Sequence, residues 1–208
     1  MPDARAHLAA LRALAEAHAG LSCLVSDALG RSGAMSSLVR PMWAGARLLG
    51  PAITVQPHGN DISAVFAAIE RAGPGDVIVV AGHGDASAAA WGENATLLAT
   101  RQGVAGTVLG MPCRDVEAHG RLGYPIFATG ATPCGGVLGQ RGKVQIPISV
   151  AGLVVAPGDG VVADENGVAV IPAERLADVV DAIPGLLERE RQLQADIATG
   201  HGISRRRP

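Results

Sequence analysis

Three charged residues, Glu93, Arg114 and Asp115, have the types and the spacing of a site for a small acid. An arginine offers a planar fork of N–H donors to a carboxylate or a 2-oxo acid, and a neighbouring aspartate offers hard oxygen to Mg²⁺ or Mn²⁺. An adjacent Arg-Asp pair is, however, more often a solvated surface ion pair of little energetic weight. The elements that must position the pair therefore decide between the two interpretations.

The residues before Arg114 predict a helix, a strand and a turn. Residues 94–102 have helical apolar spacing, and we expect Leu97 and Leu98 to face the core. Residues 104–109 are typical of a buried strand. The turn that follows places the Arg-Asp pair at the C-terminal end of this strand, where open α/β sheets gather ligand groups.

A helix that begins near Gly92 would direct free backbone N–H groups toward the same pocket. The amides of Glu93, Asn94 and Ala95 would suit a small carboxylate, because the helix dipole favours negative charge there. The Glu93 side chain is explained equally well as a surface acid that complements the dipole and as an acid of the site. The candidate substrate-binding set is therefore Gly92, Glu93, Asn94, Ala95 and Arg114.

Other residues that could do chemistry lack a supporting pattern. No two of His58, His83 and His119 have the i, i+4 spacing of a helical metal site, so surface or loop-packing roles are favoured. The loop at 82–85 contains a lone Gly-x-Gly, which is weak evidence for dinucleotide binding. Cys113 is more simply a small packing residue than a redox-sensitive one. The three cysteines have no metal-ligand spacing and suggest a reducing compartment.

Composition excludes several classes of function. The chain of 208 residues has 48% hydrophobic and 2% aromatic residues, so Ala, Val, Leu and Ile must fill its core. Its net charge of −2 provides no electrostatic footprint for nucleic acid. No run approaches the roughly 20 apolar residues of a membrane span, and the N-terminal segment lacks the apolar stretch of a secretory signal. We therefore expect a soluble, cytoplasmic protein without nucleic-acid or membrane partners.

The remaining pattern predicts a layered α/β domain with a β-rich second layer. A helix is expected at residues 3–18, and a helical segment at 173–199, which Pro184 should break or kink. Residues 46–56 carry a Gly-Pro inside an apolar run, which indicates a strand with a bulge or at an edge. Further expected elements are a helix at 61–72, a strand at 77–80 and a hairpin of 161–164 with 168–171 around an Asn-Gly turn.

An ordered set of motifs resembles one known family: SDALG at 26–30, GPAITV at 50–55, PGDVIVV at 74–80, WGE at 91–93, GVAGTV at 103–108, Arg114-Asp115, PIFA at 125–128, and PGD at 157–159 leading to ADENGV at 163–168. Through them, residues 22 to 200 resemble the class II, metal-dependent pyruvate aldolases, such as 4-hydroxy-4-methyl-2-oxoglutarate aldolase, and the related regulators of ribonuclease E activity. The resemblance implies a swivelling β/β/α fold, with residues 1–208 forming a single domain. It also implies a homotrimer or homohexamer with sites at subunit boundaries.

The resemblance further implies roles for individual residues. Asp115 would hold the divalent metal, Mg²⁺ or Mn²⁺, partly through waters, and Arg114 would bind the pyruvyl group. Glu93, which stands where characterised aldolases have an aspartate, would transfer a proton through water, and the amides of residues 93–95 would grip the carboxylate. Glu190 matches an acid that the family supplies from a neighbouring subunit.

One position departs from the pattern of the family. The signature ends with an acid that falls at Ala118 here, with Glu117 one place early, so a water or metal contact from this position is in doubt.

By this resemblance the protein is expected to be a divalent-metal-dependent lyase that cleaves a C–C bond of a 2-oxo acid and releases pyruvate. It would act as a 4-hydroxy-4-methyl-2-oxoglutarate-type aldolase, as an oxaloacetate decarboxylase, or as both. The alternative is a non-catalytic, protein-binding regulator of a ribonuclease. A methyltransferase is rejected, because no glycine-rich adenosylmethionine loop is present. The distal half of the substrate is unassigned, and the candidates to bind it are Arg31, Arg40 or loop residues of a neighbouring subunit.

Overall fold

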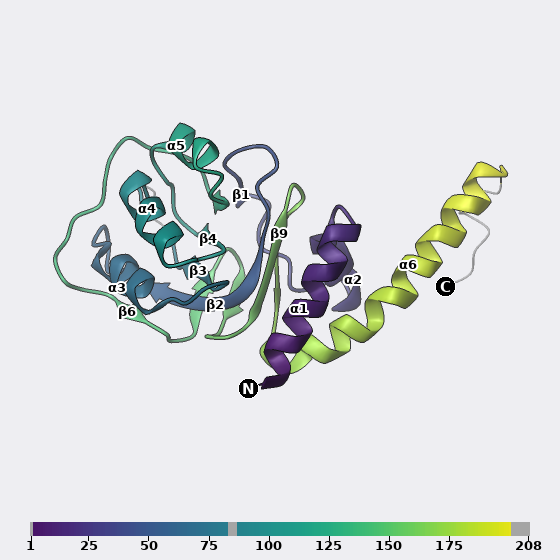
Figure 1. Ribbon diagram of the computed structural model, residues 1–208. Coiled ribbons are helices and arrows are strands. Elements are labelled where there is room, and N and C mark those ends of the chain that lie inside the picture. The colour runs from purple at the N-terminus through teal and green to yellow at the C-terminus, as the bar shows by residue number, and fades with distance from the viewer. Residues whose placement is uncertain (1, 83–86, 201–208) are drawn as a thin grey trace.

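The computed structural model describes residues 2–82 and 87–200, and an eight-stranded sheet forms its centre (Figure 1). The strand order is β1-β5-β4-β3-β2-β9-β10, with β6 paired to β2, and β7 and β8 form a second sheet. Strands β2 to β5 are parallel to one another, whereas β9 is antiparallel to both β2 and β10. The strands are β1 (Arg40–Pro41), β2 (Leu48–Gln56), β3 (Val77–Val80), β4 (Gly106–Leu109), β5 (Ile126–Ala128), β6 (Lys143–Val144), β7 (Ile148–Val150), β8 (Leu153–Val155), β9 (Gly160–Asp164) and β10 (Gly167–Ile171).

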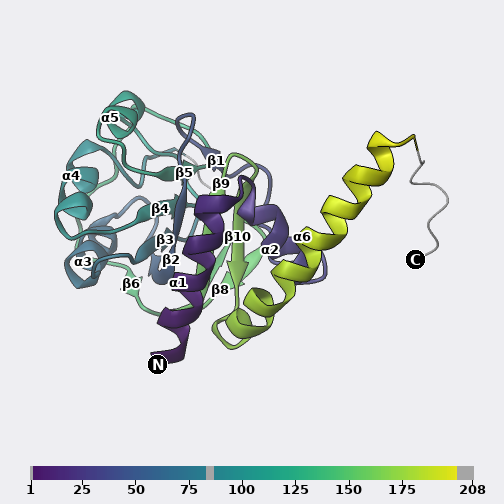
Figure 2. The same cartoon turned by 45° about the vertical axis from the view of Figure 1, so that its right-hand side comes forward.

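The helices form two groups on either side of this sheet system (Figures 1 and 2). Helices α3, α4 and α5 lie beside the parallel strands, and α1, α2 and α6 lie beyond β9 and β10. The helices are α1 (Pro2–Ala17), α2 (Leu21–Ala28), α3 (Ser63–Arg71), α4 (Glu93–Arg101), α5 (Val116–Arg121) and α6 (Leu176–Ala198), the last preceded by a short 3₁₀ turn, Ala173–Arg175. The expected N-terminal helix and the C-terminal helical segment are both present.

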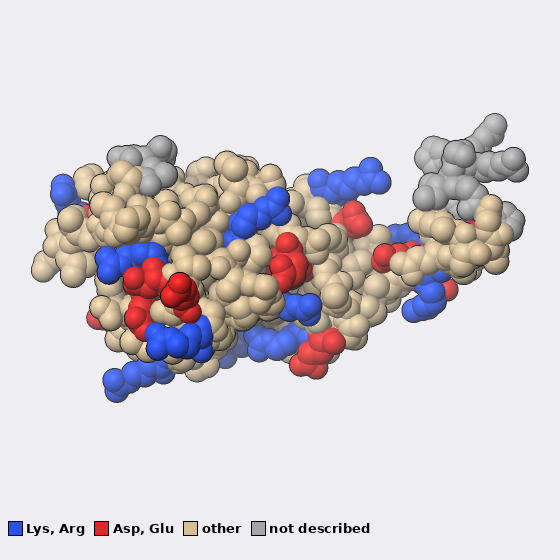
Figure 3. Space-filling model, turned by 90° about the horizontal axis from the view of Figure 1, so that it is seen from above, with Lys and Arg blue, Asp and Glu red and all other residues tan. Residues whose placement is uncertain are grey.

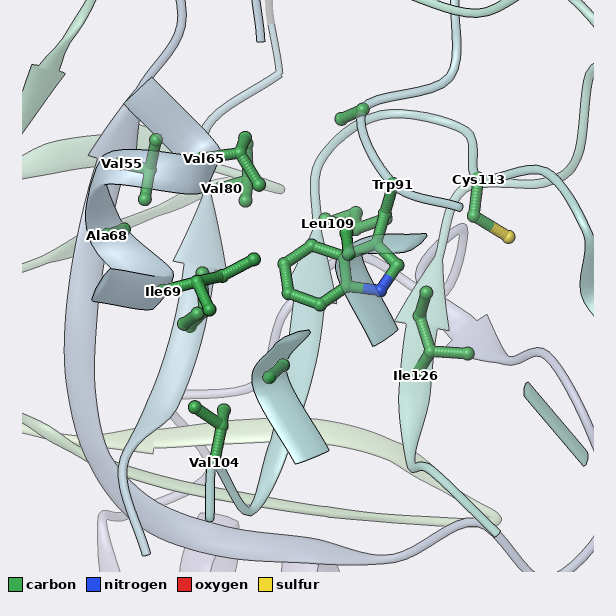
Figure 4. Packing of buried hydrophobic residues seen from close by; sticks show 14 of the residues in the cluster. Val55, Val65, Ala68, Ile69, Val80, Trp91, Val104, Leu109, Cys113 and Ile126 are labelled. Atoms are coloured by element: carbon green, nitrogen blue, oxygen red, sulfur yellow. The ribbon is translucent and has the colours of Figure 1, made fainter. Parts of the chain in front are cut away.

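Three apolar clusters hold these layers together. The first packs α3 and α4 on one face of the parallel strands, with Ile69, Trp91 and Leu109 among its largest members (Figure 4). The second joins the opposite face, through residues such as Val77 and Val79, to β7–β10. The third covers the outer face of β9 and β10 with α1, α2 and α6. Because side chains of β3 alternate between the first two clusters, its four apolar residues are all buried, and the layered β/β/α prediction is confirmed.

The strand with the Gly-Pro is not at an edge, which was one of the two expected alternatives, but joins two parts of the sheet. Its first half, Leu48–Pro51, pairs with β9, and its second half, Ala52–Val55, pairs with β3. Pro51, which lacks an N–H, is the last residue of β2 that pairs with β9, and the pairing with β3 begins at the next residue. A Cβ at Gly50 would lie 2.0 Å from the Gly75 carbonyl oxygen, so the crossing requires glycine. The pair therefore marks a close approach of two chain segments.

Helix α4 is present, but the prediction of which face is buried is wrong. Leu97 and Leu98 are 49% and 45% exposed, whereas Ala95, Thr96 and Ala99 are buried against the sheet. Small side chains at i and i+4 let the helix axis lie close to the strands, and two adjacent leucines cannot both lie on that narrow face.

Helix α6 continues through Pro184, so a break, which was one of the two expected effects of this proline, is absent. Pro184 is exposed, so the carbonyl that loses its intrahelical donor can be hydrated. Only Leu176, Val179 and Ile183 of this helix are buried, and its later turns extend away from the body (Figure 2). Within residues 2–82 and 87–200, no helix combines the length and the apolar character needed to span a bilayer.

Candidate functional site

The loops that follow β3 and β4 meet at the C-terminal edge of the parallel sheet, as the sequence predicts. Helix α4 begins at Glu93 after Gly92, and α5 begins directly after Asp115. The Arg114 amide donates to the Trp91 carbonyl at 2.9 Å, which joins the two loops directly before the two helices. The Glu93 and Arg114-Asp115 segments, twenty residues apart in the chain, are therefore adjacent in space.

The Asp115 carboxylate is the centre of the site. Its Oδ2 accepts the Glu93 backbone N–H at 2.9 Å and contacts Arg114 Nε at 3.3 Å. The Glu93 amide lowers the pKa of Asp115 most, and the Arg114 charge adds to the effect against a smaller opposing effect of burial. Asp115 is therefore ionised at neutral pH and caps the start of α4 from the neighbouring loop.

The backbone at this point is constrained. Asp115 has φ 56° and ψ 41°, a left-handed conformation that non-glycine residues adopt at a cost and that clusters at functional sites. A Cβ at Gly92 would lie 2.7 Å from Asp115 Oδ2 and 3.0 Å from Arg114 Cγ, so only glycine fits opposite the pair.

The Glu93 side chain forms an ion pair that the sequence analysis did not anticipate. Glu93 Oε1 lies 2.6 Å from Arg121 Nη2 at the end of α5, and both side chains are exposed. Since the Glu93 amide is taken by Asp115, the amides of Asn94 and Ala95 are those of the first turn for which no acceptor is found among the described residues. They are the N–H groups left for a bound carboxylate.

A chain of buried hydrogen bonds holds the backbone of Arg114 on its core side. His119 is fully buried, and its Nε2 lies 2.7 Å from the Arg114 carbonyl oxygen, which can only accept, so Nε2 carries the proton. Its Nδ1 then accepts from Thr96 Oγ1 at 2.9 Å, and Thr96 Oγ1 accepts from Trp91 Nε1 at 2.8 Å. Burial lowers the pKa of His119, which favours this neutral form. A packing role is thus confirmed for His119, and a surface position is wrong.

A cavity of about 150 Å³ opens beside these residues. Its polar side consists of residues 91–95 with Arg114 and Asp115, and its other walls are Ile62 and Phe66 of the α3 region and the Gly135–Gly136 backbone. The volume is below the roughly 300–1,000 Å³ of sites for drug-sized ligands and suits a small acid. These other walls could not be predicted from the sequence, because apolar residues and glycines far away in the chain have no chemical signature.

The remaining candidates lie apart from this cavity. Cys113 is buried, and burial raises the pKa of its thiol to about 11, as expected for a packing residue. Glu190 lies on α6 and lines a different groove between α1, α2 and α6, so its expected role in a neighbouring subunit's site stays a prediction. Ala118 is buried and Glu117 exposed on α5. His83 and the loop at 82–85 fall outside the described residues except for Gly82.

The side chains at the site offer few ligands for a divalent metal ion. The part of the chain that the structure describes holds no group of three or more His, Cys, Asp or Glu side chains close enough to bind a metal ion. Mg²⁺, however, is commonly held by one or two carboxylates and completed by waters and substrate oxygens. Asp115 is ionised and 36% exposed at the cavity, and its Oδ1 accepts no hydrogen bond from the described residues. A single-carboxylate site of this kind fits the residues present.

Acidic and basic side chains are mixed over the face seen from above (Figure 3). Groups of the two signs lie next to each other, and no extended basic area is present on this face. A small ligand is favoured there over a polyanion.

One family model and several known proteins are similar to this chain. The RraA-like family model, described as Aldolase/RraA, matches residues 22–170. Protein DlpA of Legionella pneumophila is 34% identical over 194 residues, covering 89% of this chain but 32% of that protein, so the chain spans about a third of its length. The 4-hydroxy-4-methyl-2-oxoglutarate aldolase of Thermus thermophilus is 30% identical over 148 residues, 71% of this chain and 90% of that protein. The crystal structure of Streptomyces coelicolor RraAS2, described as an unusual member of the RNase ES inhibitor RraA protein family, superposes with a TM-score of 0.73 at 30% identity, covering 86% of this chain and 93% of that chain.

The buried His119 leads to a pH-dependent prediction. Because its pKa is lower in the folded protein than the roughly 6.5 of an unfolded chain, the stability that depends on neutral His119 is present above about pH 6.5. It is lost as the pH falls below that value toward the lowered pKa of the folded state. The free energy of unfolding in urea should therefore fall more steeply between about pH 7.5 and pH 5 for the wild type than for His119→Gln. His58→Gln, at an exposed position, controls for the replacement of a histidine. Equal slopes for the wild type and His119→Gln would contradict the buried neutral imidazole.

Proposed function

Because the chain belongs to the RraA-like family of aldolases and RraA proteins, we propose that it is a divalent-metal-dependent lyase that releases pyruvate from a 2-oxo acid. The reaction is the cleavage of a 4-hydroxy-4-methyl-2-oxoglutarate-type substrate, the decarboxylation of oxaloacetate, or both. One observation carries the proposal: the Arg114 guanidinium and the ionised Asp115 carboxylate lie side by side at a small cavity beside the start of a helix.

Arg114 binds and orients the pyruvyl half of the substrate. Its guanidinium matches a carboxylate or a 2-oxo acid in planarity and hydrogen-bond geometry. The amides of Asn94 and Ala95 add donors for the substrate carboxylate at the positive end of the α4 dipole. Breaking the C–C bond leaves the enolate of pyruvate, and the Arg114 charge stabilises the oxygen on which negative charge develops.

Asp115 would hold the divalent cation, Mg²⁺ or Mn²⁺. When bound, such a cation supplies Lewis-acid polarisation of the keto oxygen. Asp115 suits this role because its low pKa keeps it ionised, while Glu93 N–H and Arg114 Nε orient its carboxylate from one side.

Glu93 accepts the proton of the substrate hydroxyl in the aldol cleavage, directly or through a water. Its carboxylate pairs with Arg121, and this exposed pair is weak enough to open when substrate enters. Loss of CO₂ from oxaloacetate leaves the same enolate without a hydroxyl to deprotonate. The two reactions therefore differ in their need for Glu93.

The protein would act as a homotrimer or homohexamer, with Glu190 completing the site of a neighbouring subunit. Two features support this assembly. The later turns of α6, which carry Glu190, extend away from the body (Figure 2). Leu97 and Leu98 leave apolar surface on α4 uncovered in a single chain.

The metal and Arg114 can be tested together. EDTA should abolish pyruvate release from oxaloacetate and from a 4-hydroxy-2-oxo diacid, and Mg²⁺ or Mn²⁺ should restore it. Arg114→Ala should lower kcat/KM by about 10²- to 10³-fold, because a donor to the developing oxyanion is lost. Arg101→Ala, at the other end of α4, is the matched control and should retain activity. Activity that survives both EDTA and Arg114→Ala would rule out this mechanism.

A second prediction separates the two reactions. Glu93→Gln removes the proton acceptor, so aldol cleavage should fall by about 10²-fold or more, while oxaloacetate decarboxylation falls far less. Both rates are measured as pyruvate release by the same preparation. An equal loss of both would assign Glu93 to binding or folding and not to proton transfer.

A non-catalytic regulator of a ribonuclease is the second candidate. The likeness to RraAS2 supports it, as does Ala118, which stands where the expected signature has an acid. Under this alternative, the purified protein should bind and inhibit a purified ribonuclease in a pull-down and cleavage assay, and Arg114→Ala should leave that inhibition intact. Turnover of 2-oxo acids without ribonuclease binding would exclude it.

A further inference from the structure

A long segment, residues 130–142, crosses the C-terminal edge of the parallel sheet above the site, and we call it the strap. It forms bridges in turn with Cys113 after β4, with Ala89 after β3 and with Asp61 after β2. It then continues into β6, which pairs with the end of β2. The strap therefore passes over the ends of β4, β3 and β2 in turn. Its middle, Gly135–Gly136, is one wall of the cavity.

Asp61 fastens the end of this strap to the start of α3. The Asp61 side chain is 1% exposed, its Oδ1 accepts the Ser63 N–H at 3.0 Å, and its Oδ2 accepts the Arg141 N–H at 3.0 Å. Arg141 Nε lies 3.7 Å from the same Oδ2. Hydrogen bonds from Ser63 hold the pKa of Asp61 well below its usual range, so it is a charged acceptor at neutral pH.

Further bonds surround this carboxylate and depend on the same alignment. The Gln140 N–H donates to Ser63 Oγ at 2.9 Å, and the Ile62 N–H donates to the Val137 carbonyl at 3.0 Å. The Val137 N–H in turn donates to the Asn60 carbonyl at 2.9 Å. Asp61 is the buried, charged group of this set. If its carboxylate oxygens are lost as acceptors, N–H groups of both segments are left without partners.

Close packing transmits the position of the strap to the candidate site. A Cβ at Gly136 would lie 2.6 Å from Ile62 Cγ2, and one at Gly135 would lie 2.6 Å from Arg114 Nη1. The backbone thus lies against a cavity wall on one side and against the guanidinium on the other. A shift of the strap by less than the size of one methyl group would move it onto Arg114 or away from it.

We propose that Asp61 is a positioning residue for the 2-oxo acid pocket, which it serves by holding the strap so that Gly135 confines the Arg114 guanidinium. The role rests on the proposed function for its effect on turnover, but the effect on the Arg114 side chain does not depend on any reaction. Asp61 itself is not among the residues that line the cavity, so it acts through the strap.

A buried aspartate elsewhere in the chain provides a matched control. Asp164 is 5% exposed and accepts Ser22 N–H at 2.9 Å, Ser22 Oγ at 2.8 Å and Asn166 N–H at 2.9 Å. It joins α2 to the β9–β10 hairpin, away from the cavity. Asp164→Asn and Asp61→Asn therefore remove comparable buried acceptors, and only the second should affect the site.

A second pair of variants leaves both carboxylates in place. A Cβ at Gly139 would lie 2.6 Å from Asp61 Oδ2, so Gly139→Ala should push the strap off Asp61. At Gly73 the nearest atom to an added Cβ is at 3.7 Å, an ordinary contact, so Gly73→Ala is its control. If Asp61→Asn does not fold, this pair of variants still tests whether the position of the strap affects Arg114.

The experiment measures urea stability, kcat and KM for oxaloacetate with Mg²⁺, and the ¹⁵N–¹H signal of Arg114 Nε, assigned by its loss in Arg114→Lys. We expect Asp61→Asn and Gly139→Ala to raise KM by about tenfold or more and to shift or broaden the Arg114 signal, because small misplacements of binding groups are costly. Asp164→Asn and Gly73→Ala should keep KM within about twofold and the signal unchanged, whatever their stability.

The outcomes separate this inference from the proposed function. An unchanged Arg114 signal in folded Asp61→Asn or Gly139→Ala would overturn the positioning role, and so would an unchanged KM in an active protein. A wild type without turnover would defeat the proposed function alone, since the Arg114 signal would still decide whether Asp61 holds the strap in place.

Discussion

The hydrogen bond from the Glu93 amide to Asp115 Oδ2 is the contact on which the candidate site depends. It places a carboxylate from one loop at the N-terminus of a helix that belongs to the next loop, where unpaired amides and the helix dipole favour negative charge. The same bond lowers the pKa of Asp115 and so favours its ionised form, and Arg114 Nε lies 3.3 Å from the same carboxylate oxygen. The left-handed backbone of Asp115 and the missing side chain at Gly92 are the conditions for this approach.

The surroundings of this bond restrict movement on the side toward the core. The chain of hydrogen bonds from Trp91 through Thr96 to His119 ends on the Arg114 carbonyl, so the backbone of the arginine is held by buried groups. On the opposite side, the strap backbone lies close to the guanidinium. A binding arginine whose main chain and side chain are both confined loses less conformational entropy when it captures a ligand, which is the physical benefit of a preorganised site.

Membership of the RraA-like family is consistent with either chemistry or regulation, and residues of the site bear on the choice. Arg114, Asp115 and Glu93 are retained beside a cavity of a size suited to a small acid, which supports the lyase. Ala118 removes an acid from α5, while Arg121, one turn later on the same helix, pairs with Glu93. This chain therefore has fewer acidic groups at the site than the expected signature, and in the proposed metal site Asp115 is the carboxylate ligand.

The sequence by itself determined the layers of the fold, the strand-end position of the Arg-Asp pair and the proximity of Glu93. Apolar runs, turn residues and the order of strands and helices are local features, and a parallel sheet brings the ends of its neighbouring strands together. Local patterns did not reveal which face of α4 is buried, because alanines at i and i+4 pack as closely as leucines. They also did not reveal the role of the Gly-Pro in β2, because that role depends on Gly75, which approaches from another segment. The support of His119, the pairing of Glu93 with Arg121 and the strap held by Asp61 were decided by tertiary structure alone, because each is a contact between groups whose chemistry appears only when distant segments are packed together.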